Sequence, residues 1–112
     1  MKEVISFSDF DKLDIRIGTV TSAEKVEGAD RLLRLMVDTG EEKDRQVVSG
    51  IAEHFPAPEV LVGRQVPVLV NLAPRIIKGI ESGGMILYAV GDNFLYTMEP
   101  GEKNIPPGTA VK

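Results

Sequence analysis

The residues best suited to chemistry in this sequence lie between Asn71 and Met85. The segment contains an amide, two cations, a hydroxyl and a thioether, at Asn71, Arg75, Lys78, Ser82 and Met85. The amide and the hydroxyl form hydrogen bonds, the cations neutralise phosphate, and a thioether packs against the face of a base. None of these groups is a nucleophile with a general base beside it in sequence. The segment therefore predicts a binding surface and not a reaction centre.

Three further cations extend this hypothesis to the earlier part of the chain. Arg31, Arg34 and Arg45 lie on or near the predicted second and third strands. Each has an acidic residue close in sequence, so a solvated, salt-bridged surface explains them as well as a binding face does. Both explanations stay open for these arginines. Arg75 and Lys78 have fewer acidic neighbours, which favours binding.

Other catalytic and metal-binding motifs are incomplete. Gly79 and Gly84 have the spacing of a phosphate-binding P-loop, but Met85 and Ile86 follow where lysine and Ser/Thr are needed. His54 is the single histidine and there are no cysteines, which excludes thiolate catalysis, disulfides and cysteine zinc sites. We expect no catalytic residue, no metal and no cofactor.

The composition of the chain predicts one soluble globular domain. It has 112 residues, of which 43% are apolar and 27% charged. No apolar stretch approaches the roughly 20 residues of a membrane span, and the segment 1–5 lacks the build of a signal peptide. We therefore expect a cytoplasmic protein with no membrane partner.

The net charge of -4 argues against a general nucleic-acid binder, for which a basic domain is expected. However, every charge between Val60 and Ile80 is positive, and the acidic residues gather elsewhere. A cationic face on an acidic body would favour a selective contact over indiscriminate binding to polyanions.

Hydrophobic alternation predicts the elements that position these groups. Strands are expected over 15–20, 32–38, 45–51, 66–70 and 86–90, with a polar turn over 24–30 and a hairpin over 39–44. A short helix capped by Ser8 should precede the strands, and a helix of one or two turns should lie within 58–62. The segment 71–85 is expected to be the long loop between the last two strands.

Five strands with a short helix between the third and the fourth are typical of an OB-fold barrel, whose open face binds oligonucleotides or oligosaccharides. An SH3-like barrel or a small sandwich would give similar periodicity. We predict an all-β fold with short helices, a single domain over 1–112, with a five-stranded OB-fold barrel at about 12–91 and a C-terminal extension at about 92–112. Apolar residues in that extension, Phe94, Leu95, Tyr96 and Met98, require burial that a second subunit could supply.

Several motifs resemble one known family closely. They are Asn71-Leu72-Ala73-Pro74-Arg75 and Gly79-Ile80-Glu81-Ser82-Gly83-Gly84-Met85, together with the segments 10–18, 29–33 and 45–52. This pattern is similar to the tRNA-binding domain of methionyl-tRNA synthetases, where it occurs at the C-terminus or as a separate beta chain. The same domain occurs as a free-standing structure-specific tRNA-binding protein and in EMAP-II-like cytokine precursors. The resemblance spans essentially the whole chain.

The resemblance implies an OB-fold core, a homodimer formed through the terminal segments, and no catalytic activity of its own. It also implies recognition of the outside corner of tRNA by shape and backbone, as a synthetase beta chain or a tRNA chaperone. The partners would be tRNA, a second copy and the catalytic chain of methionyl-tRNA synthetase. The implied RNA-contacting loop carries Asn71, Arg75, Lys78, Ser82 and Met85, and the basic strand face carries Arg31, Arg34 and Arg45. The alternative is a peptide-binding export chaperone of the CsaA type, which has a related fold.

Overall fold

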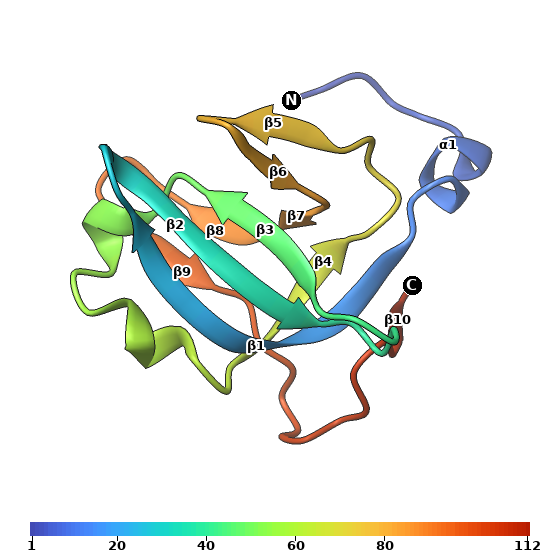
Figure 1. Cartoon of the computed structure of the whole chain (residues 1–112). Coiled ribbons are helices and arrows are strands. Elements are labelled where there is room, and N and C mark those ends of the chain that lie inside the picture. The colour runs from blue at the N-terminus through green and yellow to red at the C-terminus, as the bar shows by residue number, and fades with distance from the viewer.

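The protein, described over all 112 residues by a computed structural model, consists mainly of one curved antiparallel sheet (Figure 1). Its strands are β1 (Ile15–Val26), β2 (Ala29–Asp38), β3 (Arg45–Ser49), β4 (Gln65–Leu69) and β7 (Met85–Ile86), in the order β3-β2-β1-β4-β7. The C-terminal strand β10 (Ala110–Val111) also pairs with β1.

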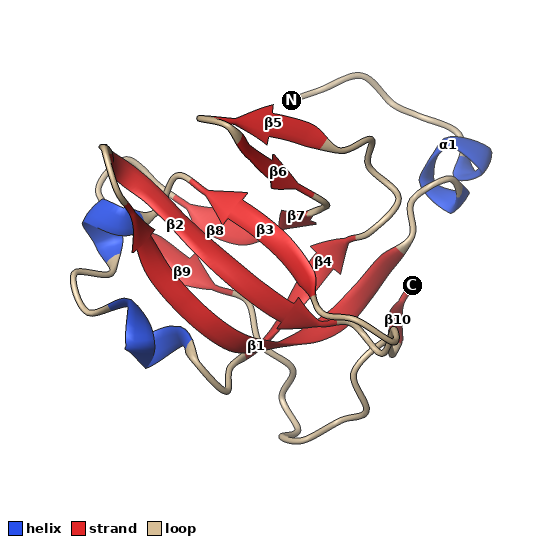
Figure 2. Cartoon of the chain, in the orientation of Figure 1, coloured by secondary structure: helices blue, strands red, loops and turns tan.

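Two hairpins complete the β structure. One joins β5 (Arg75–Ile77) to β6 (Ile80–Ser82), and the other joins β8 (Tyr88–Val90) to β9 (Leu95–Thr97). The helices are short: α1 (Phe7–Asp11) and the 3-10 helices η1 (Ala52–His54) and η2 (Pro58–Leu61) (Figure 2). None of them is long and apolar enough to cross a membrane.

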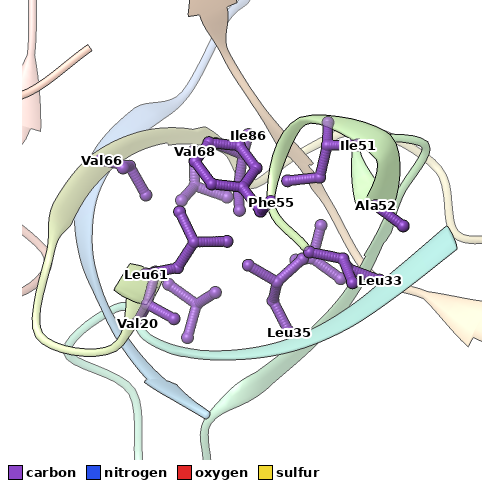
Figure 3. Close-up of a cluster of buried hydrophobic side chains, with 12 residues drawn as sticks. Val20, Leu33, Leu35, Ile51, Ala52, Phe55, Leu61, Val66, Val68 and Ile86 are labelled. Carbon is purple, nitrogen blue, oxygen red and sulfur yellow. The ribbon is translucent and has the colours of Figure 1, made fainter. Parts of the chain in front are cut away.

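The core lies inside the curved sheet. Leu33, Leu35 and Val37 of β2 are buried, whereas Arg34 and Met36 point away from the core, as the alternation predicted. Residues from the other strands and from the loop that contains both 3-10 helices close the cluster (Figure 3). The mostly β, barrel-like architecture confirms the predicted fold class.

The β6–β7 segment brings the two ends of the sheet together. Gly83 N donates to Gln46 O at 2.8 Å, and Val48 N donates to Ser82 Oγ at 3.0 Å. These bonds attach residues 82 and 83 to β3, while β7 pairs with β4. The curved sheet is thereby linked across its open side (Figure 1).

The sequence prediction was wrong about several boundaries. The predicted polar turn over 24–30 is mostly strand, because Glu24 and Lys25 pair with Arg34 and Leu33, and only the residues around Gly28 turn. The helix near the N-terminus is capped by Ser6 and not by Ser8, since Asp9 N donates to Ser6 Oγ at 3.2 Å.

Two more predicted elements differ in the second half of the chain. The expected long loop over 71–85 contains the β5–β6 hairpin, because Lys78 and Gly79 take the positive φ values of 52° and 78° that a tight turn needs. The predicted strand 86–90 is divided at Leu87 between β7 and β8, and β8 pairs with β9 instead of with the main sheet.

The C-terminal segment packs back onto the barrel. Ile17 exchanges backbone hydrogen bonds with Thr109 and Gly108, at 2.8 and 2.7 Å. The Gln65 side chain bonds both backbone groups of Ile105. Residues 105–111 are therefore fastened to β1 and β4.

Candidate functional site

The β5–β6 hairpin presents two different faces. Arg75 pairs with Ser82 and Ile77 pairs with Ile80, so these four side chains share one face. Ile76 and Glu81 form the intervening pair and point the other way. Arg75 and Glu81 therefore lie on opposite faces of this hairpin.

Ser82 attaches the hairpin to the barrel. Its side chain accepts a hydrogen bond from Val48 N at 3.0 Å and donates to Gly84 O at 3.3 Å. The residue is only 5% exposed. Both hydrogen-bonding functions of the hydroxyl are used within the protein, which assigns Ser82 to holding the hairpin in place.

Gln46, which the sequence reasoning missed, joins β2, β3 and the hairpin. Arg34 Nε donates to Gln46 Oε1 at 2.6 Å, and Gln46 Nε2 donates to Glu81 O at 2.7 Å. Arg34 also forms an ion pair with Glu24. The only sequence signal that could have identified Gln46 was its outward-facing position in the hydrophobic alternation of β3. The amide orients the Arg34 guanidinium beside the hairpin.

Arg45 is the first residue of β3 and directly precedes Gln46. Its Nη1 donates to Val70 O at 3.0 Å and to Gly83 O at 2.6 Å, and it forms an ion pair with Glu41. Hydrogen bonds from Arg45 and then from Thr39 lower the pKa of Glu41 below its ordinary value. This arginine joins the 39–44 loop to the segments on both sides of the hairpin.

Asn71 connects the start of the hairpin segment to the N-terminal helix. Asp14 N donates to Asn71 Oδ1 at 2.9 Å, and Asn71 Nδ2 donates to Lys12 O at 2.6 Å. The side chain therefore satisfies two backbone groups where the chain enters β1.

The remaining predicted residues are exposed. Arg75 and Lys78 take part in none of the six ion pairs of the structure. Met85 is 42% exposed at the start of β7. Arg31 forms an ion pair with Glu53 at 3.3 Å in which both side chains are largely solvated, so it is available to other anions.

Arg34 and Arg75 belong to one row of neighbouring residues. Arg34 lies opposite Val48, Val48 is hydrogen-bonded to Ser82, and Ser82 lies opposite Arg75. Two strand pairings and one side-chain hydrogen bond link the two arginines, so their backbones are on the order of 15 Å apart. β2, β3 and the hairpin lie in this order in Figure 1, so the strands that carry the two predicted cationic regions are near each other.

A cavity of about 430 Å³ lies beside the hairpin, on the face that carries Arg75. Its walls are mainly apolar and include Leu72, Ile77, Met85 and Val90, and Arg75 is its one charged lining residue. Tyr88 also lines it, and the Tyr88 hydroxyl donates to Ser49 Oγ at 3.2 Å. Burial raises the pKa of Tyr88 to about 12, so the phenol stays neutral. Sequence reasoning did not find this cavity, because its walls come from separate segments.

No group of three or more His, Cys, Asp or Glu side chains in the structure is arranged to hold a metal ion.

Comparison with known proteins gives one consistent family. The family described as "Putative tRNA binding domain" matches residues 15–110. The chain is 50% identical over 112 residues to "Methionine--tRNA ligase" of Methanococcoides burtonii, covering 98% of this chain and 16% of that protein. It is 58% identical over 111 residues to the protein of the same name from Flavobacterium psychrophilum, with 98% and 16% covered. The chain thus spans about a sixth of the length of these curated relatives.

Two solved structures match almost the whole chain. A "MetRS related protein" from Pyrococcus horikoshii has a TM-score of 0.89 and 34% identity, covering 99% of this chain and 100% of that one. The chaperone CsaA from Bacillus anthracis has a TM-score of 0.87 and 32% identity, with 98% and 100% covered.

Proposed function

This chain belongs to the tRNA binding domain family, and from that premise we propose that it is a structure-specific tRNA-binding protein. It acts as the beta chain or accessory domain of a methionyl-tRNA synthetase or as a free-standing tRNA chaperone. It contributes binding and no catalysis of its own. Its setting is the cytoplasm, and its further partner is the catalytic chain of the synthetase.

The observation that supports this function best is the row of cations across β2, β3 and the hairpin. Arg75 and Lys78 are exposed and take part in no ion pair, and Arg34 lies on β2, which is separated from the hairpin by β3. Phosphate oxygens accept hydrogen bonds from such groups, and RNA shape is read through phosphates and 2′-hydroxyls. The whole chain has a net charge of -4, so the surface away from these cations is acidic and disfavours contact with RNA there.

The eight predicted residues divide into two roles in this proposal. Arg31, Arg34, Arg75, Lys78 and Met85 are exposed or partly exposed and contact the RNA. Asn71, Arg45 and Ser82 are engaged with backbone groups and hold the contacting segments in position.

In this proposal the protein forms a homodimer. Val90, Phe94, Tyr96 and Met98 remain exposed on or beside the β8–β9 hairpin, and the Phe94 and Tyr96 rings stack at 5.2 Å. A contiguous exposed apolar cluster marks an interaction site. Burial against a second copy gives the segment 92–112 a role in dimerisation beyond the barrel.

A gel shift with total tRNA tests the function directly, with duplex RNA and duplex DNA of similar length as controls. We expect a shifted complex with tRNA at concentrations that leave both duplexes free. If about three to five phosphates are neutralised, log affinity should fall with log salt at a slope of roughly -2 to -4. Equal binding of all three nucleic acids would contradict structure-specific recognition.

The second candidate is a peptide-binding chaperone, favoured by the likeness to CsaA and by the apolar cavity. Competition between labelled tRNA and an unfolded polypeptide separates the two functions. Binding of the polypeptide without binding of tRNA would establish the alternative.

A further inference from the structure

The cavity beside the β5–β6 hairpin has a size and lining that suit one flat apolar ligand. Its volume of about 430 Å³ is within the range of roughly 300–1,000 Å³ that is common for small-ligand sites. Met85 is partly exposed at its wall, and Tyr88 lies deeper, with its hydroxyl bonded to Ser49. A thioether and an aromatic ring both pack well against a planar π-system.

The charge of the cavity indicates what else this ligand carries. Arg75 is the one charged residue in the lining, and Lys78 follows at the turn of the same hairpin. The hairpin's acid, Glu81, lies on the opposite face, where it borders a separate polar pocket with Arg45 and Gln46. The cavity thus combines apolar walls with a cationic rim and has no carboxylate to repel an anion. A nucleotide has this combination, with an apolar base face joined to phosphate.

We propose that this cavity receives one unstacked nucleobase of the bound tRNA while Arg75 contacts the adjoining phosphate. The inference rests on the proposed function and names the part of the RNA that the site takes. Stacking accepts every base, since each has a π-face, so such a pocket strengthens binding without selecting one sequence. It requires an exposed, unpaired nucleotide in the RNA, which a continuous duplex lacks.

Gly50 allows the cavity to be narrowed without disturbing the barrel. It lines the cavity, and a Cβ added there would meet no atom within 4 Å. Its φ lies outside the left-handed region, so Gly50→Leu is not strained. Gly101 has the same open surroundings and lies outside the cavity lining, which makes Gly101→Leu the matched control.

The test measures the affinity of the full chain for tRNA at several salt concentrations. We expect Gly50→Leu to raise the dissociation constant about tenfold, since one base stack contributes roughly five- to a hundredfold. The salt slope should not change, because no phosphate contact is lost. Gly101→Leu should bind as the unaltered protein does. Unchanged affinity of Gly50→Leu would overturn the base pocket and leave the proposed function standing. Absence of tRNA binding by the unaltered protein would overturn both.

A photochemical measurement on the unaltered protein gives an independent answer if Gly50→Leu does not fold. The probe is a tRNA transcript containing 4-thiouridine, irradiated in the complex, with the cross-linked peptide identified by mass spectrometry. We expect cross-links within residues 72–77 or 85–90. Cross-links confined to β1 and β2 would overturn the base pocket. Gly50→Leu could instead abolish binding of an unfolded polypeptide and leave the affinity for tRNA unchanged. That result would assign the cavity to peptide side chains and would also overturn the base pocket.

Discussion

The hydroxyl of Ser82 accepts a hydrogen bond from the backbone N–H of Val48 at 3.0 Å. The bond joins the exposed β5–β6 hairpin to β3, although the two residues are 34 positions apart in the chain. Because Ser82 also lies opposite Arg75, and Val48 lies opposite Arg34, this bond positions Arg75 relative to β2, the strand that carries Arg34. The proposed binding surface therefore depends on a side chain that itself has almost no exposure.

Ser82→Ala should destabilise the protein and loosen the hairpin. The substitution leaves the buried Val48 N–H without its acceptor, a loss of about 1–3 kcal/mol in the free energy of unfolding. Urea unfolding measures this loss, and hydrogen exchange at Val48 reports the local opening. Ser22→Ala on the exposed part of β1 is the control and should change neither. Slow exchange at Val48 in the variant would show that the hydroxyl is dispensable.

Arg75→Gln should weaken tRNA binding through lost phosphate contact. We expect the magnitude of the slope of log affinity against log salt to fall by about 1, equally for different tRNAs. The melting temperature should not change, because Arg75 is exposed and makes no ion pair. Lys43→Gln removes one charge from the loop between β2 and β3 and serves as the control. A weakening restricted to one isoacceptor would contradict recognition by shape.

Stability should decline in acid through Glu41. Its pKa in the folded protein is lowered from 4.5, first by the hydrogen bond from Arg45 and then by that from Thr39. The folded state binds this proton less readily than the unfolded chain does, so the contribution is complete above about pH 4.5 and is lost as the pH falls through the folded pKa. Urea midpoints for Glu41→Gln and the unaltered protein should differ most near neutral pH and converge in acid.

Glu42→Gln is the matched control for this titration, because Glu42 is exposed and takes part in no ion pair. Its urea midpoint should follow that of the unaltered protein throughout. A Glu41→Gln midpoint that stays equally low at every pH would assign the effect to the altered side chain and not to its charge.

Tyr96→Glu should convert the proposed dimer to a monomer. A carboxylate at this exposed position would be desolvated in an interface built from Phe94, Tyr96 and Met98. Sedimentation at micromolar concentration should give twice the mass of one chain for the unaltered protein and the mass of one chain for the variant. Val62→Glu, at an exposed apolar residue beside η2, should remain dimeric. A monomeric unaltered protein would remove the role assigned to the β8–β9 face.

The fold class was predictable because its signal is local. The alternation of Leu33, Leu35 and Val37 with Arg34 and Met36 is a property of neighbouring residues, and the pleat of a strand converts it directly into a buried and an exposed face. The boundaries were less predictable. Glu24 and Lys25 have the composition of a turn, but pairing with Arg34 and Leu33 on the next strand extends β1 through them.

The sequence by itself determined the all-β class, the buried face of β2 and the set of cations and polar groups near the hairpin. Only the tertiary structure decided which of these groups are available to a ligand. An amide or hydroxyl has the same hydrogen-bonding capacity whether its partner is RNA or backbone, and the partners of Ser82 and Asn71 at Val48 and Asp14 lie 34 and 57 positions away. Folding brings those partners within 3.0 Å and leaves Arg75 and Lys78 exposed and outside every ion pair, because the two strands of the hairpin pair only with each other.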